Sequence, residues 1–237
     1  MAFEGDTAPR LGYNGRVDAP ELAGLPFSRG AIPSVQLAAG PWDPQELMAG
    51  EAPFAVLLVS GLLIRDHALA GTVASELLGP GDLVELGQDG DAFVAGAMRW
   101  TVLEPTRLAV LDARILGQLG RHPELAARLL QRAGRQIWRA SVHRSIAQLP
   151  RVELRLLGLL WHLAERYGRV NATGVIVPIE LRHETLGRLI GARRPTVSLA
   201  VKALADEGSV LRRADGAWVL RHDSLDALAH SPRRGGV

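Results

Sequence analysis

Hydrophobic residues in the first half of the chain recur in short runs between turn-forming residues. The runs are Val35–Ala38, Phe54–Ile64, Gly71–Leu78, Leu83–Leu86, Ala92–Met98 and Thr101–Leu111. Segments such as Gly79-Pro80-Gly81-Asp82 separate them. Short strands punctuated in this way are typical of a β-sandwich or barrel. We therefore predict a β domain over 31–111, after a loose segment over 1–30 that lacks periodicity.

Between 112 and 149 the hydrophobic spacing becomes helical. Leu130 and Ile137 are seven residues apart, and the complementary small positions are Ala126, Ala133, Ala140 and Ala147. This spacing resembles the seam of a coiled coil and predicts a helix that pairs two copies of the chain. The alternative is an amphipathic helix packed on its own domain. Leu149-Pro150 should end the helix, because proline lacks an N–H and clashes with the preceding turn, so we expect a hinge there.

After this hinge, residues 150–237 show the pattern of a small α+β domain. Val152–Tyr167 is predicted as an amphipathic helix and Val175–Val177 as a short strand. Two helices follow, over Arg182–Ile190 and Pro195–Asp206. Glycine at 191 permits the left-handed conformation that a tight turn between the helices requires, and proline is favoured at the first position of the second helix.

A hairpin is expected after the second helix. Asp215-Gly216 lies between two apolar runs, 210–213 and 217–220, and Asp-Gly in that setting is a strong hairpin pattern. A strand, two helices and a hairpin in this order form a winged helix-turn-helix, with the hairpin as the wing. The second helix of such a motif enters the major groove of DNA with its amino-terminal end.

The candidate DNA contacts follow from this placement. Arginine bonds bidentately to guanine, while threonine, serine and lysine mainly anchor phosphates. The candidates at the two helices are His183, Arg193, Arg194, Thr196, Ser198, Leu199 and Lys202. On the wing, Arg212 and Arg213 are placed to reach backbone phosphates. A plain surface role for His183, Thr196 or Ser198 is the alternative.

Charge supports an anionic partner for the second half of the chain. The total net charge is only +2. Residues 1–108 carry about 6 basic and 14 acidic side chains, a net charge of about −8, whereas 109–147 and 148–237 carry about +5 each. The chain has no cysteine, which excludes disulfides and cysteine-ligated metals. No signal peptide or membrane span is visible, and we expect a soluble, cytoplasmic protein.

Residues 179–198, with the sequence IELRHETLGRLIGARRPTVS, resemble the Crp/Fnr family of bacterial transcription regulators. The resemblance extends over roughly 33–225 and implies an α+β fold. Its parts are a sensory β-roll that resembles cyclic-nucleotide-binding domains, a connector and long dimerisation helix over 112–149, and a winged helix-turn-helix. It also implies a homodimer that binds double-stranded DNA at a pseudo-palindromic operator, contact with RNA polymerase, and often a small-molecule effector in the β-roll.

The effector pocket departs from the family pattern. Members that bind cyclic AMP hold the ribose with a Gly-Glu pair and the phosphate with an Arg-Ser/Thr pair. The equivalent residues here are Gly81, Asp82, Glu85 and Arg99, and the Arg-Ser/Thr pair is missing. Since an anionic phosphate needs positive charge or several donors, we expect an effector other than cyclic AMP. A pocket filled by Phe93, Met98 and Trp100, with no effector, is the alternative.

The recognition helix also departs from the pattern. Pro195 and Leu199 stand where some members have Glu and Arg, so the half-site of those members does not transfer. Arg182 stands where a threonine cap is common. The seven histidines lack zinc-motif spacing, and no catalytic motif is present, so we expect neither a metal nor an enzyme. The competing functional hypothesis is a ligand-sensing or protein-interaction module that does not bind DNA.

Overall fold

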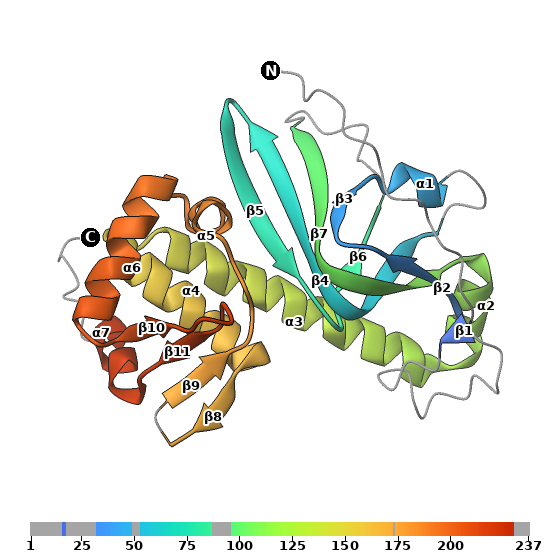
Figure 1. Cartoon of the computed structure of the whole chain (residues 1–237). Coiled ribbons are helices and arrows are strands. Elements are labelled where there is room, and N and C mark those ends of the chain that lie inside the picture. The colour runs from blue at the N-terminus through green and yellow to red at the C-terminus, as the bar shows by residue number, and fades with distance from the viewer. Residues whose placement is uncertain (1–15, 18–31, 49–52, 87–95, 173, 230–237) are drawn as a thin grey trace, which may run out of the picture. The chain divides into compact units, whose positions relative to one another are not determined.

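The computed structural model describes residues 16–17, 32–48, 53–86, 96–172 and 174–229. The chain forms two compact units, residues 1–138 and 139–237 (Figure 1). The division falls within one long helix, ahead of the Leu149-Pro150 break. Most of the loose segment predicted over 1–30 lies outside the described residues.

The amino-terminal unit is built on one antiparallel sheet. Its strands are β1 (Arg16–Val17), β2 (Ile32–Leu37), β3 (Gly40–Trp42), β4 (Ala55–Leu69), β5 (Thr72–Leu78), β6 (Leu83–Val84) and β7 (Ala97–Leu111), with the short helix α1 (Gln45–Met48) after β3. The order is β1-β2-β7-β4-β5, with β3 paired to β7 and β6 to β4. The predicted β architecture is confirmed. Strand β3 lies outside the predicted runs, and residues 92–95 of the predicted run Ala92–Met98 lie outside the described residues.

The long strand β4 bends in its middle. Its pairing with β7 shifts register between Leu58 and Leu63. Gly61 lies in this stretch with φ +85°, and a Cβ there would be 2.4 Å from the Pro105 carbonyl oxygen. Glycine is therefore required for the sheet to fold over its own core. That core includes Trp42 and Trp100, whose rings meet edge to face at 5.6 Å.

Two helices follow β7, in the segment predicted as a connector and dimerisation helix. They are α2 (Ala113–Arg121) and α3 (Pro123–Ala147). Asp112 caps α2 by accepting hydrogen bonds from two backbone N–H groups. The break comes at His122, with φ −130° and ψ 78°, because a residue before proline is disfavoured in helical conformation. Pro123 then starts α3, where its missing N–H costs nothing.

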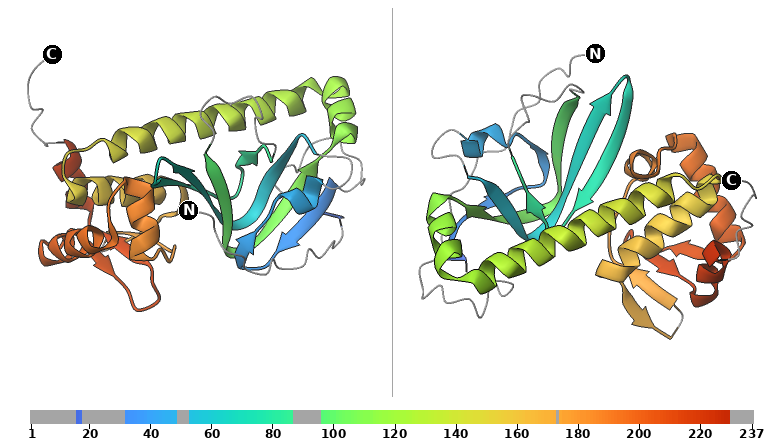
Figure 2. Two further views of the ribbon diagram at one scale, coloured as in Figure 1. Left: turned by 90° about the horizontal axis from the view of Figure 1, so that it is seen from above. Right: turned by 180° about the vertical axis from the view of Figure 1, so that it is seen from behind.

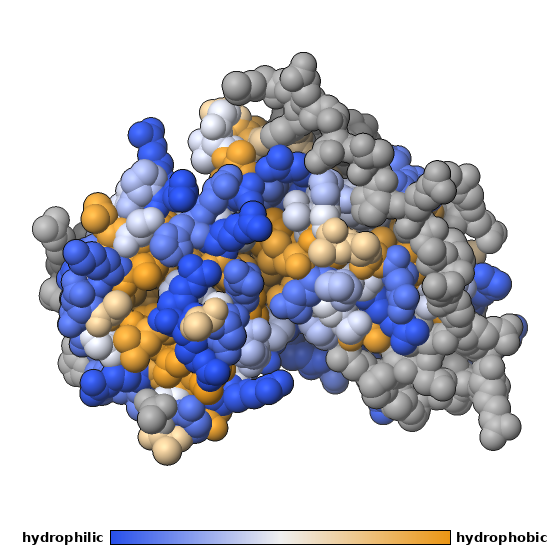
Figure 3. Space-filling view, viewed as in Figure 1, coloured by the Kyte–Doolittle hydropathy of each residue, from blue (hydrophilic) through white to orange (hydrophobic). Residues whose placement is uncertain are grey.

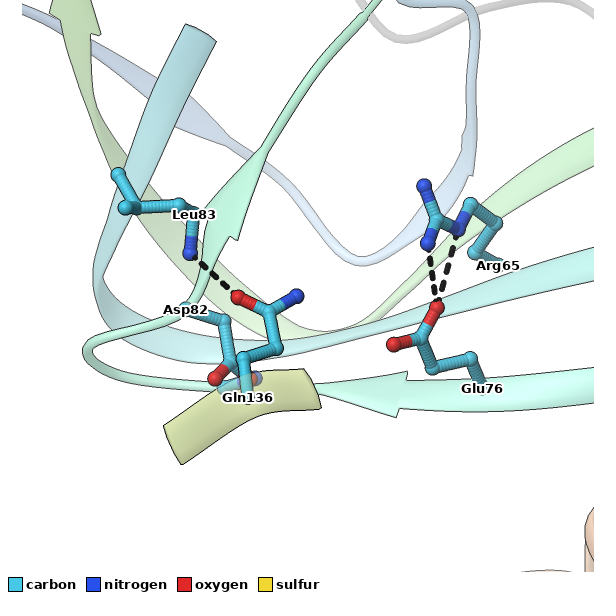
Figure 4. A network of polar contacts seen from close by, with 6 residues as sticks. Arg65, Glu76, Asp82, Leu83 and Gln136 are labelled. Atoms are coloured by element: carbon cyan, nitrogen blue, oxygen red, sulfur yellow. Dashed lines mark hydrogen bonds and ion pairs between the residues drawn. The ribbon is translucent and has the colours of Figure 1, made fainter. Parts of the chain in front are cut away.

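The first part of α3 packs against its own unit on one side. Leu125 and Leu129 are buried, and the partly buried Leu83 and Leu119 pack against them. The Leu83 N–H donates to Gln136 Oε1 over 3.0 Å, which ties α3 to the turn before β6 (Figures 2 and 4). A separate ion pair across β4 and β5, Arg65–Glu76, lies nearby in the same view (Figure 4).

The predicted seam residues of α3 lie on another side. Leu130 and Ile137 are 72% and 66% exposed, and Trp138 is 59% exposed. The residues of α3 that pack on their own unit are therefore Leu125 and Leu129. The predicted seam residues Leu130 and Ile137 do not pack there. Three large apolar side chains remain open to solvent on one long helix.

The carboxyl-terminal unit contains the predicted winged helix-turn-helix. Its elements after α3 are α4 (Val152–Tyr167), β8 (Arg169–Asn171), β9 (Gly174–Val177), α5 (His183–Ile190), α6 (Arg194–Asp206), β10 (Val210–Arg212), β11 (Trp218–Leu220), η1 (His222–Leu225) and α7 (Asp226–Ala229). The sheet order is β10-β11-β9-β8. Helix α4 has the predicted bounds, and β8 is an additional strand. In the part of the chain that the structure describes, no helix is both long and apolar enough to cross a bilayer.

The three helices α4, α5 and α6 share a core with the sheet. Its innermost side chains include Leu156, Leu160, Leu186, Ile190, Val197, Ala200, Leu204, Trp218 and Leu220. Each helix buries its apolar face, as the helical spacing predicts. This packing fixes which face of α6 points to solvent.

Candidate nucleic-acid interface

The turn between α5 and α6 depends on two glycines. Gly191 has φ +65° and ψ 42°, the left-handed region that was predicted for it. At Gly187, a Cβ atom would lie 2.5 Å from the Ala192 carbonyl oxygen, and the Ala192 N–H donates to the Gly187 carbonyl oxygen over 2.8 Å. Sequence reasoning does not single out Gly187, because a glycine inside a helical pattern has several interpretations.

Helix α6 presents one buried face and one open face. Val197, Ala200 and Leu204 are buried. The opposite ridge, at spacing i, i+4, i+7, consists of Pro195, Leu199 and Lys202, all exposed. The helix begins at Arg194, one residue earlier than predicted, and Pro195 lies in its first turn as expected.

Most of the predicted contacts on α6 are accessible. The exposed ones are Arg193, Arg194, Thr196, Leu199 and Lys202, while Ser198 is half-buried. Arg193, at the position before the helix, makes no side-chain capping bond. The amino-terminal end of α6 therefore carries two exposed guanidinium groups and the positive end of the helix dipole.

His183, at the start of α5, is joined to α6 by a hydrogen bond. Its Nδ1 lies 2.9 Å from Ser198 Oγ, and the Ser198 hydroxyl donates to the Arg194 carbonyl oxygen over 3.1 Å. Since that hydroxyl proton is already used, Nδ1–H must be the donor to Ser198. Burial, followed by the charges of Arg212 and Arg194, holds the pKa of His183 below its ordinary value. Its Nε2 is buried without a hydrogen-bond partner among the described residues.

The wing is a tight hairpin, as predicted from Asp215-Gly216. Gly216 has φ +83°, and a Cβ there would meet the Glu180 side chain at 2.8 Å. Arg213 pairs with Asp215 at 2.9 Å, and the Arg212 guanidinium lies 5.3 Å from the centre of the Trp218 ring. Both wing arginines are exposed.

Side chains from three elements meet around one concavity of about 390 Å³. Its lining residues are Arg182, His183, Glu184, Arg194 and Arg212, from the starts of α5 and α6 and from β10. Three cations surround the neutral His183 and a single carboxylate. On the face shown in Figure 3, hydrophilic and hydrophobic residues are intermixed around α5, α6 and the wing. We define the DNA-facing cluster as Arg182, His183, Arg193, Arg194, Lys202, Arg212 and Arg213.

Arg155 of α4 is a positioning residue that the sequence analysis missed. Its Nε donates to the Leu149 carbonyl oxygen over 2.5 Å, and its Nη1 donates to the carbonyl oxygens of Ile190 and Gly191 over 3.5 and 3.4 Å. It thus ties the end of the α3–α4 connection to the turn between α5 and α6. Helical spacing places Arg155 on α4, but only the tertiary structure reveals these partners.

The four candidate effector residues of the β-roll do not gather at one place. Gly81 and Asp82 form the turn before β6, where the buried Asp82 carboxylate accepts a hydrogen bond from the Gly79 N–H over 2.9 Å. Glu85 is exposed. Arg99 pairs with Asp66 near the far end of β4, at 3.3 Å, whereas β6 pairs with β4 at Val56 and Leu57.

Arg99 instead lines a concavity of about 280 Å³ that is framed by β3 and β7. The other lining residues are Pro41, Trp42, Asp43, Pro44, Met98 and Trp100. Trp100 is buried in the core, Met98 is half-buried, and Phe93 lies outside the described residues. Asp66, Arg99 and Ser75 form a connected polar group, because Ser75 Oγ donates to the Asp66 carboxylate over 2.5 Å.

Comparison with known proteins agrees with this architecture. Residues 154–229 match the model of the Crp-like helix-turn-helix domain. No curated protein matches the chain in sequence.

Similar solved structures extend the agreement to both units. A CooA mutant from Carboxydothermus hydrogenoformans superposes with a TM-score of 0.65 and 17% identity, over 84% of this chain and 86% of that one. FixK2 from Bradyrhizobium japonicum gives 0.63 and 15%, over 87% and 100%. A cyclic nucleotide-binding domain containing protein from Listeria monocytogenes gives 0.65 and 16%, over 89% and 97%. The chain therefore shares the fold of these solved structures, and its residues 154–229 are similar to a Crp-like helix-turn-helix domain.

Proposed function

We propose that the protein is a transcription regulator that binds specific sites on double-stranded DNA as a homodimer. The observation that carries the proposal is the open face of α6, bordered by the cations of the DNA-facing cluster. The match of residues 154–229 to a Crp-like helix-turn-helix domain supports DNA as the partner.

The chemistry of the DNA-facing cluster fits a duplex. Arginines on the wing and at the starts of α5 and α6 are suited to phosphates on the rims of a groove. An exposed arginine in the first turn of a recognition helix reaches base edges, where a bidentate pair with guanine is the commonest specific contact. We assign this role to Arg194 and the phosphate contacts to His183, Arg193, Thr196, Ser198, Lys202, Arg212 and Arg213.

The homodimer is supported by the exposed stripe on α3. Leu130, Ile137 and Trp138 are too apolar and too close together to be left in water without cost. Pairing α3 with the same helix of a second copy buries all three, and the heptad spacing of Leu130 and Ile137 suits that contact. A two-fold dimer then places one α6 in each half of a pseudo-palindromic operator.

We propose that the amino-terminal unit either senses an effector other than cyclic AMP or works without an effector. Arg99 forms an ion pair with Asp66. Glu85 directly follows β6, which pairs with a different part of β4. Arg99 would therefore not supply positive charge to a phosphate held at Gly81 and Asp82. RNA polymerase is proposed as the further protein partner, on the basis of the family resemblance.

Selection from random duplexes, followed by titration at several salt concentrations, tests this function. Binding should weaken steeply as salt rises, because phosphate contacts release counterions. Arg194→Ala should lose most of the specific binding, whereas Arg169→Ala, an exposed arginine on β8, should not. If no duplex is selected and no salt-dependent binding is found, the alternative of a protein-interaction module replaces this proposal.

A further inference from the structure

The centre of the open face of α6 is apolar. Leu199 is 69% exposed, the most exposed leucine among the described residues of the carboxyl-terminal unit. Its neighbours on the ridge are Pro195, one turn before, and Lys202, nearly one turn after. Single apolar residues on a surface are common, but this one occupies the middle of the face that the DNA-facing cluster surrounds.

The packing of α6 against the other described residues leaves Leu199 largely exposed. Val197, Ala200 and Leu204 define the buried face, and Leu199 lies on the opposite side of the helix. Arg193 and Arg194 precede it, and Lys202 follows. A partner for this surface must present negative charge at the edges and an apolar group at the centre.

The major groove of DNA has that arrangement. Phosphates line its rims, and the only methyl group on its floor is the C5 methyl of thymine. Most other groups on the base edges there are hydrogen-bond donors or acceptors, which leucine would leave unsatisfied at a cost, and the C–H edges of the other bases offer leucine less apolar surface than a methyl group does. Thymine is therefore the base that complements Leu199.

We propose that Leu199 determines specificity by packing on the C5 methyl group of a thymine, so that each half-site carries one thymine within reach of the middle of α6. The inference rests on the proposed function and adds a residue-level rule to it. Arg194 selects one base by hydrogen bonds, and Leu199 selects another by apolar contact about one helical turn further along α6.

Replacement of thymine by deoxyuridine tests the proposal, because it removes only the methyl group. After selection of an operator by the full-length protein, each thymine of one half-site is replaced in turn. One position should lower wild-type affinity by about fourfold, the value of one buried methyl or methylene group. Leu199→Ala should be indifferent to that replacement, while its weak binding to unrelated duplexes stays close to wild type.

Leu225→Ala provides a matched control. Leu225 is 48% exposed on η1, away from the ridge of α6, so this variant should keep the wild-type response to deoxyuridine. The proposal is overturned if no thymine is sensitive, or if Leu199→Ala responds to deoxyuridine as the wild type does. Specific binding that persists in either case leaves the proposed function intact, whereas absence of all DNA binding overturns both.

Discussion

His183 Nδ1 lies 2.9 Å from Ser198 Oγ, although the two residues are 15 apart in sequence. The contact joins α5 to α6 beside the concavity that His183 lines together with Arg194 and Arg212, and the Nε2 atom of the imidazole is buried. A phosphate bound in that concavity would favour the protonated, charged form of the ring. In the free protein the pKa of His183 lies below its ordinary value, so the ring is neutral near pH 7.

The first prediction is therefore a pH dependence of DNA binding. A phosphate favours the charged imidazole, so the pKa of His183 is higher in the complex than in the free protein, and binding takes up a proton. Affinity should rise as pH falls from about 8 to about 6. The charged groups around the ring are Arg182, Glu184, Arg194 and Arg212.

Titrations at fixed salt measure this effect. His183→Gln should flatten the pH profile, and His222→Gln, at an exposed position on η1, should leave it as in the wild type. If the pH profile of His183→Gln keeps the wild-type slope, the proton taken up on DNA binding goes to another group.

The second prediction concerns Arg194. Arg194→Ala should lower specific affinity by about 1–3 kcal/mol and relax the preference at one base pair. The reason is the loss of a bidentate contact to a base edge. Selection with the variant, compared with selection by Arg169→Ala, measures both effects. An unchanged footprint and an unchanged consensus would remove Arg194 from the base-contacting residues.

The third prediction separates the wing from the recognition helix. Arg212→Ala should weaken binding to all sequences about equally and reduce the salt slope by about 1, because a phosphate contact carries no base information. Arg221→Ala is the matched control, since Arg221 is exposed and pairs with Asp223 beyond the wing. A change of consensus in Arg212→Ala would instead indicate a base contact.

The fourth prediction concerns the apolar stripe of α3. Ile137→Glu should convert the dimer to a monomer, because it places charge in the proposed seam. Affinity for a full operator should then fall by about 100-fold or more, since the second half-site no longer adds to the first. Sedimentation measures the mass, with Arg128→Glu, an exposed site on α3 away from the stripe, as control. A variant that stays dimeric would place the interface elsewhere.

The fifth prediction compares two glycines. Gly187→Ala should destabilise the carboxyl-terminal unit by about 1–3 kcal/mol, because the new Cβ meets the Ala192 backbone oxygen. Gly117→Ala, in α2 with nothing within 4 Å of the new atom, should stabilise its helix by roughly 0.5–1 kcal/mol. Denaturant unfolding measures both changes. Equal effects at the two sites would contradict the close approach seen at Gly187.

Local chemistry explains what the sequence predicts well. Gly191 and Asp215-Gly216 specify their turns by themselves, and the apolar spacing of α4 fixes a helix whose ends coincide with the structure. The structure confirms the α+β fold and the helix-turn-helix. The break at His122 follows equally local chemistry, because it precedes Pro123, but the periodic pattern around it hides it.

Features that depend on long-range pairing are missing from the sequence analysis. The short strands β3 and β8 exist because β7 and β9 are beside them, and nothing in their own residues requires extension. Gly187 contacts the backbone of Ala192, five residues away, and Arg155 donates to the Gly191 carbonyl oxygen, 36 residues away. The effector set failed to converge for the same reason, since spacing along the chain does not show that Arg99 pairs with Asp66 at another part of β4.

Footprinting of the full-length protein on its selected operator measures whether α6 enters DNA. We expect two protected segments centred about one helical turn, 10–10.5 base pairs, apart or a multiple of it, both lost in Arg194→Ala. Absence of protection at every salt concentration, or equal protection by wild type and Arg194→Ala, would contradict the assignment of α6 as the helix that enters DNA.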